Sequence, residues 1–223
     1  MDMIHSPLLG NVLLYAFPLM LSGILQLLFN AADVIVVGRF AGPQALAAVG
    51  STGSLTGLLT NLFIGLSIGT NGLVARYYGA QNNESIKETI DTSIITAFFG
   101  GLILVLVGLF SSLSMLTLMG TPDDVIDLSV LYMQILFAGM PFQMLYNFGA
   151  AILRSVGDTR RPLYFLTIAG VVNVVLNLIF VIVFHMSVAG VALATIASHG
   201  VSCVLVLRCL IKSDSIISIN IRE

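Results

Sequence analysis

The sequence predicts an all-α fold, a polytopic membrane protein built as a bundle of six transmembrane helices. Hydrophobic residue types make up 57% of the 223 residues, and the mean hydropathy is +1.03. Charged residues make up only 9%, whereas a soluble domain carries roughly 25%. A soluble core of this size could not hide so many apolar side chains, so lipid is the expected solvent for most of the surface.

Six apolar stretches follow one another, and each has at least the roughly 20 residues that a spanning helix needs. Transmembrane β-strands would instead be segments of about ten residues with alternating polarity. The predicted helices cover residues 10–37, 45–75, 92–118, 128–153, 162–184 and 187–207, and together they form one membrane-embedded lobe over residues 1–212.

Turn and breaker residues justify these elements in order. Gly42 and Pro43 predict a short loop between the first two helices. Residues 76–91 are expected to be the longest polar connection. Thr121 and Pro122 predict an N-cap, followed by proline at the first position of the fourth helix.

Two prolines lie inside predicted spans. Pro18 in the first helix and Pro141 in the fourth each remove a backbone hydrogen bond, so each predicts a kink. The sequence leaves open whether these kinks are fixed or act as hinges.

The basic residues predict the orientation. All of the nine Lys and Arg residues except Arg39 fall on alternate connections or the carboxyl-terminal tail. The positive-inside rule therefore predicts a multi-pass protein of the plasma membrane with both termini in the cytoplasm. Residues 213–223 are polar and are expected to form a cytoplasmic tail or the start of a linker between lobes.

Asp33 is the one charged residue within the first apolar stretch. Gln26, Asn30 and Asp33 are spaced by four and three residues, so we expect a polar stripe that lines a cavity. An acid near the carboxyl end of a helix is poorly placed as a passive cap, and intramembrane acids are usually functional. The alternative is that Asp33 reaches the membrane surface.

Three further polar residues are candidates for the same site. Asn173 and Asn177 are four residues apart in the fifth helix, and Thr195 lies in the sixth, with Ser198 and Ser202 on about the same face. Such residues often serve only as hydrogen-bonding glue between helices. With the carboxylate of Asp33 they would instead offer hard oxygen ligands for Na+, and the carboxylate alone could bind H+.

Several function classes are excluded by composition and spacing. A net charge of −2 without a dense basic cluster argues against a nucleic-acid partner. No Cys and His spacing resembles a ligand set, so no metal other than Na+ and no cofactor is expected. An intramembrane enzyme would need a catalytic pair or a buried metal set, so we expect no enzyme activity.

The chain resembles the multidrug and toxic compound extrusion transporters from about residue 7 to residue 212. The order and spacing of several motifs carry this resemblance: 30–33 (NAAD), 37–39 (VGR), 45–50 (ALAAVG), 75–80 (ARYYGA) and 153–162 (LRSVGDTRRP). The resemblance covers only the first of the two lobes of that family.

The resemblance implies a twelve-helix antiporter that exports organic cations or other drugs in exchange for Na+ or H+. In the family, the residues at the positions of Asp33, Asn173, Asn177 and Thr195 line a cation site. Some relatives carry a second carboxylate where Asn177 stands, which leaves the coupling ion open. The implied partners are a drug-like substrate, the lipid bilayer, and a second six-helix lobe or a second copy of the chain.

Two other functions remain as alternatives. A flippase for lipid-linked oligosaccharides or polysaccharides belongs to the same wider superfamily, but it would need more buried positive charge for pyrophosphate than the sequence offers. A membrane scaffold without transport would not need its polar stripes to converge.

Overall fold

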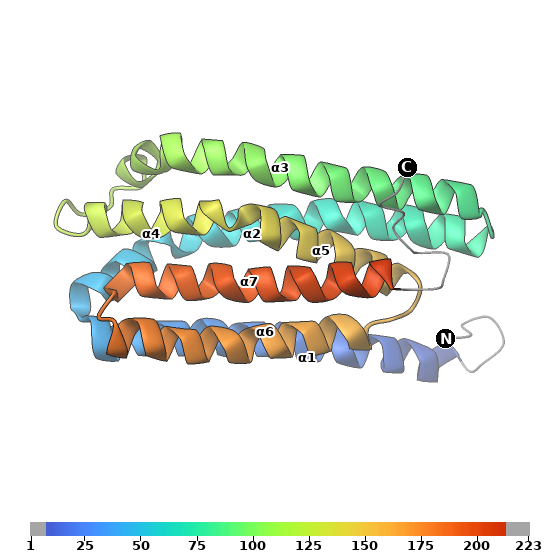
Figure 1. The fold of residues 1–223 in the computed structure, drawn as a ribbon, viewed down its shortest axis with the longest axis horizontal. Helices are drawn as coiled ribbons and strands as arrows, with labels where there is room; N and C mark the ends of the chain where they lie inside the picture. The colour runs from blue at the N-terminus through green and yellow to red at the C-terminus, as the bar shows by residue number, and fades with distance from the viewer. Residues whose placement is uncertain (1–7, 213–223) are drawn as a thin grey trace.

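The computed structural model describes residues 8–212, and within that range the chain folds into helices without strands. They pack side by side as one elongated bundle (Figure 1). The elements are α1 (Leu8–Val36), η1 (Val37–Ala41), α2 (Pro43–Gly79), α3 (Asn83–Leu118), α4 (Ile126–Ala138), α5 (Met140–Ser155), α6 (Arg160–Leu178), η2 (Ile179–Val183) and α7 (Ser187–Ile211), where η marks a π-helix.

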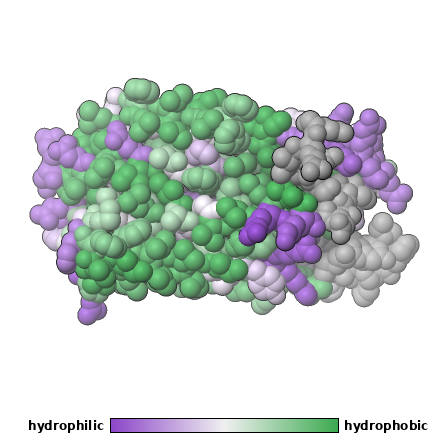
Figure 2. Space-filling model, in the orientation of Figure 1, coloured by the Kyte–Doolittle hydropathy of each residue, from purple (hydrophilic) through white to green (hydrophobic). Residues whose placement is uncertain are grey.

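The length and apolar character of the helices are those of a membrane protein. Within residues 8–212, five helical stretches are long and apolar enough to cross a membrane, and α4 with α5 makes a sixth if the bent pair counts as one span. The side chains form a broad apolar band between two hydrophilic ends (Figure 2). The predicted all-α membrane fold is therefore confirmed.

The fourth span differs in shape from the single helix predicted over 128–153. It breaks at Gly139 into α4 and α5, which are bent by 47° relative to each other. Pro141 lacks the N–H that would continue the ladder across this point, so the kink predicted at Pro141 is present. A Cβ added at Gly101 of α3 would lie 2.5 Å from Cα of Pro141, so glycine lets α3 approach the break.

The predicted polar connection 76–91 is largely helical. Helix α2 continues to Gly79 and α3 begins at Asn83, so both extend beyond the bounds read from hydropathy. Gln81 takes the left-handed conformation in the turn between them, with φ 55°. The Asn82 side chain caps α3 by accepting a hydrogen bond from the Ser85 amide at 3.1 Å.

The predicted start of the fourth helix at Thr121 and Pro122 is wrong. Helix α4 begins at Ile126. The preceding residues form a turn instead, in which the Val125 amide donates to the Pro122 carbonyl at 3.1 Å.

The bundle divides into two packed groups. Helix α1 packs on α6, and α6 packs on α7; α2 and α3 pack around the α4–α5 pair, which also contacts α7. In Figure 1, α3 and α1 lie at opposite edges of the bundle. One end, called the basic end below, carries the positive residues at helix termini: Arg76, Lys87, Arg154, Arg160, Arg161, Arg208 and Lys212. The predicted tail, residues 213–223, lies outside the described residues.

Candidate cation site

Four polar side chains from three helices form one hydrogen-bonded network. Nδ2 of Asn177 donates to Oδ1 of Asp33 and, at 3.3 Å, to Oδ1 of Asn173. Nδ2 of Asn173 donates to Oγ1 of Thr195 at 3.4 Å. The Thr195 hydroxyl donates to the carbonyl of Val191 at 2.9 Å. The structure thus brings together all four residues that the sequence predicts for a cation site.

The network is partly buried, and its one acidic group has no basic partner among the described residues. Asn177 is fully buried, Asn173 is 5% exposed, and Asp33 is half-buried. Among residues 8–212, no Lys or Arg side chain forms an ion pair with Asp33. Oδ1 of Asn177 is also buried and accepts no hydrogen bond from the described residues. A buried polar atom left unpaired in this way costs about 1–3 kcal/mol.

Both helices that carry Asp33 and the asparagines change into π-helices just beyond the network. Segment η1 begins at Val37, one turn after Asp33, and η2 begins at Ile179, two residues after Asn177. These two π segments contact each other. Single π turns are rare and often occur at functional sites, so this end of the bundle is marked by backbone geometry as well as by polar side chains.

Tyr132 of α4 is a residue near the network that sequence reasoning missed. Its side chain is 8% exposed, and it belongs to the same buried cluster as Val36 and Val37, which follow Asp33 within about one turn. The cluster also includes Val191. The available signal was a tyrosine inside an apolar span, because its hydroxyl usually needs a polar neighbour when buried.

Gln26 and Asn30 lie outside the network. Both side chains are exposed, whereas Asp33 lies where α1 meets α6. Three residues advance an α-helix by about 300°, roughly 60° short of a full turn. Asn30 is therefore rotated away from the face that carries Asp33, and Phe29, four residues before Asp33, lies closer to that face.

Ser198 and Ser202 do not join the network either. Ser198 donates to the Thr195 carbonyl at 2.7 Å, and Ser202 donates to the His199 carbonyl at 2.9 Å. Each hydroxyl is satisfied within α7.

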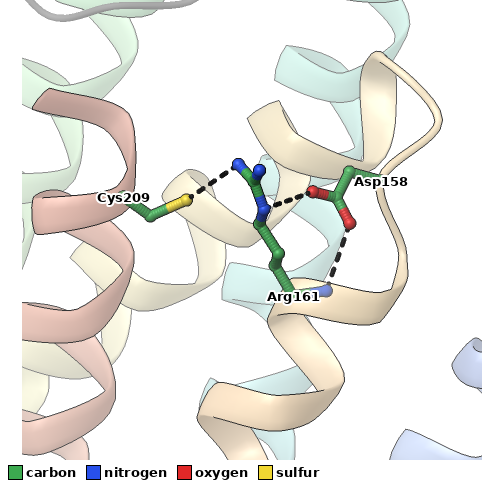
Figure 3. Close-up of polar contacts among 3 residues, drawn as sticks. All are labelled: Asp158, Arg161 and Cys209. Carbon is green, nitrogen blue, oxygen red and sulfur yellow. Dashed lines mark hydrogen bonds and ion pairs between the residues drawn. The ribbon is translucent and has the colours of Figure 1, made fainter. Parts of the chain in front are cut away.

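A separate polar cluster joins α6 to α7 at the basic end (Figure 3). Asp158 accepts from the backbone amide of Arg161 at 3.1 Å and pairs with its Nε at 3.2 Å. Nη1 of Arg161 donates to the Cys209 sulfur at 3.4 Å. This cluster ties the start of α6 to the end of α7, the two helices that supply Asn173, Asn177 and Thr195.

The arrangement is suited to a small cation. A carboxylate, amide oxygens and a hydroxyl are the ligand types preferred by hard cations. Turning the Asn177 amide over would direct its unpaired oxygen at the same point as the carboxylate. The site therefore offers oxygen ligands of the type that hard cations bind, and a carboxyl group that could take a proton instead.

Comparison with known proteins identifies the family. The MatE family model matches residues 18–179. The chain belongs to the MatE family. This agrees with the family named from the sequence motifs, the multidrug and toxic compound extrusion transporters.

Among curated MatE relatives, "Probable multidrug resistance protein YoeA" of Bacillus subtilis is 39% identical over 163 residues, which cover 73% of this chain and 35% of YoeA. "Probable multidrug resistance protein YpnP" of the same organism is 30% identical over 95% of this chain and 47% of its own length. "Multidrug export protein MepA" of Staphylococcus aureus is 22% identical, with coverage of 97% and 48%.

Solved MatE structures match the fold closely. A crystal structure of MATE in the bent conformation aligns with a TM-score of 0.87 and 30% identity, over 96% of this chain and 48% of that one. The straight conformation aligns with the same TM-score at 29% identity, over 95% and 47%. The chain thus spans about half the length of these MATE structures, as one six-helix lobe does.

Proposed function

We propose that this chain is one lobe of a membrane exporter that expels organic cations or other drug-like molecules in exchange for Na+ or H+. The observation that carries the proposal is the Asp33 network, because a half-buried carboxylate without a basic partner needs a positive ion to offset its charge. The names of the relatives, multidrug resistance and multidrug export proteins, support the substrate class.

In the proposed mechanism the coupling ion changes the charge of the α1–α6 contact. Without the ion, Asn177 donates to the charged carboxylate of Asp33. When Na+ binds, the carboxylate and the unpaired Asn177 oxygen become its ligands; when H+ binds instead, that oxygen accepts from the protonated carboxyl group. Because the ion removes the buried charge, it favours a different packing of α1, with Pro18 as a point of bending, and drug affinity falls.

The proposed partner is a second six-helix lobe or a second copy of this chain. Helix α1 packs mainly on α6, and the apolar part of its span is only 6% buried within the lobe. We place the lobe in the plasma membrane with its basic end in the cytoplasm, because positive residues there satisfy the positive-inside rule.

The polar group around Asp33 favours an exporter over a lipid-oligosaccharide flippase. Its members are one acid, two amides and one hydroxyl. A pyrophosphate-linked lipid would be repelled by this carboxylate and would need cations in its place.

The proposal is tested by dye efflux from proteoliposomes that contain the complete transporter. Efflux driven by a Na+ or H+ gradient should fall to the leak rate in Asp33→Asn. Asp123→Asn, which changes an exposed acid in the loop before α4, should keep the wild-type rate. Wild-type efflux by Asp33→Asn would exclude Asp33 as the coupling residue.

A further inference from the structure

The Phe29 ring of α1 packs directly against the backbone of α6 at Gly170, in the space that a Cβ would fill. A Cβ added at Gly170 would lie 1.9 Å from Cε2 of Phe29, 2.1 Å from Cζ and 2.3 Å from Cδ2. Real Cβ contacts are essentially never shorter than 3.0 Å. Any residue other than glycine at position 170 would therefore force the Phe29 ring out.

This contact lies on the same helix faces as the cation site. Phe29 precedes Asp33 by four residues, and Gly170 precedes Asn177 by seven. Residues four and seven apart lie within about 40° of each other around a helix, so they share one face. The aromatic contact is therefore about one helical turn from the network, between the same two helices.

Helix α1 has few other points of attachment to the lobe. The Tyr15 hydroxyl donates to the Arg154 carbonyl at 3.2 Å near the basic end, and Asp33 accepts from Asn177 at the other. Pro18 is buried, but most other apolar side chains of α1 face outward. The Phe29–Gly170 contact lies between these two hydrogen bonds and fixes the separation of α1 from α6 there.

We propose that Phe29 and Gly170 are positioning residues of the cation site: the ring seated at the bare glycine holds α1 close enough to α6 for Asp33 to reach Asn177. Neither residue touches the ion. Their effect on ion affinity rests on the proposed function, whereas their effect on the Asp33–Asn177 distance does not.

The physical reason is the steep distance dependence of hydrogen bonding. An N–H···O bond is lost when donor and acceptor separate much beyond about 3.2 Å. A methyl group at position 170 must move the ring, the helix or both by more than an ångström, because real Cβ contacts begin near 3.0 Å. The ring can take up part of this shift, but whatever it does not take up moves α1, and Asp33 then moves away from Asn177 with the helix.

Two readouts on the full chain in lipid nanodiscs test this. The first is binding of radioactive Na+, with proton uptake measured in Na+-free buffer. The second is the infrared carboxylate band of Asp33, identified as the band lost in Asp33→Asn. The band position reports the hydrogen bond from Asn177, so Asn177→Ala provides the reference for its loss.

Gly170→Ala should weaken cation binding by about 10–100-fold, the usual cost of losing a residue that orients a ligand. Its Asp33 band should shift as in Asn177→Ala. The double variant Gly170→Ala/Phe29→Ala should bind more tightly than Gly170→Ala alone, because the methyl group then occupies space vacated by the ring. This rescue separates positioning from a general loss of stability.

Gly72→Ala in α2, where a Cβ would meet no heavy atom within 4 Å, should match the wild type in both readouts.

The inference is overturned if Gly170→Ala keeps the wild-type band and affinity, or if the double variant is no better than Gly170→Ala. If the wild-type chain binds neither Na+ nor H+, the proposed function fails, and the infrared band alone decides the positioning role. If Gly170→Ala does not fold, Phe29→Ala carries the test, because it adds no clash: a shifted Asp33 band supports the inference, and an unshifted band overturns it.

Discussion

The α2–α3–α4–α5 region and the α1–α6–α7 region use polar side chains in opposite ways. In the first region polar groups meet in neutral pairs: Thr70 with Ser93 at 3.0 Å, and Gln143 with Thr60 at 3.3 Å. In the second region Asp33 adds an acidic group, and the network leaves the Asn177 oxygen unpaired. Neutral pairs hold helices together. An acidic side chain beside an oxygen that accepts no hydrogen bond can instead bind a positive ion.

Packing sets α1 apart, because it is less buried within the lobe than α2, α3, α6 or α7. A Cβ at Gly108 of α3 would lie 1.9 Å from Cγ of Phe137, so α3 and α4 are in close contact. Helix α1 has a contact of the same kind, Phe29 at Gly170, but only 6% of the residues in its apolar part are buried within the lobe. The comparison favours α2 to α5, called the frame below, as the fixed part of the lobe, and α1 as the element that the proposed ion would move.

Among the variants that compare the two regions and keep Asp33, the largest expected effect is on ion binding, when the network loses an amide. Asn177→Ala should lower the affinity for Na+ or H+ by about 10–100-fold, because it removes both the donor to Asp33 and the unpaired oxygen. Asn147→Ala is the matched control in α5, since its Nδ2 is also buried and unpaired. Radioactive Na+ binding and proton uptake measure both variants. An equal loss of ion affinity in Asn177→Ala and Asn147→Ala would show that the two regions do not differ in ion binding.

Overpacking the frame should lower stability and spare the ion site. Gly108→Ala places a methyl group against Phe137 and should destabilise the lobe by about 1–3 kcal/mol. Thermal unfolding in detergent compares it with Gly65→Ala, where a Cβ would meet nothing within 4 Å. The folded fraction should bind the ion as the wild type does, and a large change in its ion affinity would contradict the account.

Breaking one neutral pair should have a smaller effect. Thr70→Val keeps the side-chain shape but removes the hydrogen bond with Ser93, so it should cost about 0.6 kcal/mol of stability, the average for polar contacts between membrane helices. Ion affinity should not change. A steric trapping experiment measures the stability difference, and a weaker ion affinity in this variant would show that the frame is coupled to the site.

The smallest expected effect is at the exposed polar residues of α1. Asn30→Ala should leave ion affinity within about twofold of the wild type, a difference under 1 kcal/mol. The reason is that Asn30 is exposed and forms no bond with the network. If it lines the drug path, its substitution changes drug affinity alone. Drug and ion titrations on the complete transporter separate these outcomes. A tenfold weaker ion affinity would contradict the prediction and show that Asn30 belongs to the ion site.

Much of the fold followed from the sequence because lipid imposes a simple pattern. Composition and uninterrupted apolar stretches predicted the helices, and Pro141 predicted the kink in the fourth span. The candidate site was also accessible. Asp33 stood out as a charge in an apolar stretch, and Asn173 and Asn177 had to share one face of a helix because they are four residues apart.

The rest depends on how helices meet, which spacing along one helix does not determine. The stripe from Gln26 to Asp33 pointed to Asn30, but α6 contacts α1 closer to the Phe29 side. The π segments η1 and η2 have no distinct residue pattern, since a π turn differs from an α turn by one inserted residue. Tyr132 of α4 lies beside Val36 and Val37 only because of tertiary packing.

The central claim is that Asp33 binds the coupling ion, and direct ion binding tests it most closely. Radioactive Na+ binding, with proton uptake in Na+-free buffer, would be measured on the purified chain in nanodiscs for the wild type, Asp33→Asn and Asp123→Asn. The account predicts a saturable site in the wild type and in Asp123→Asn that is lost in Asp33→Asn. Saturable binding of unchanged affinity in Asp33→Asn would contradict it.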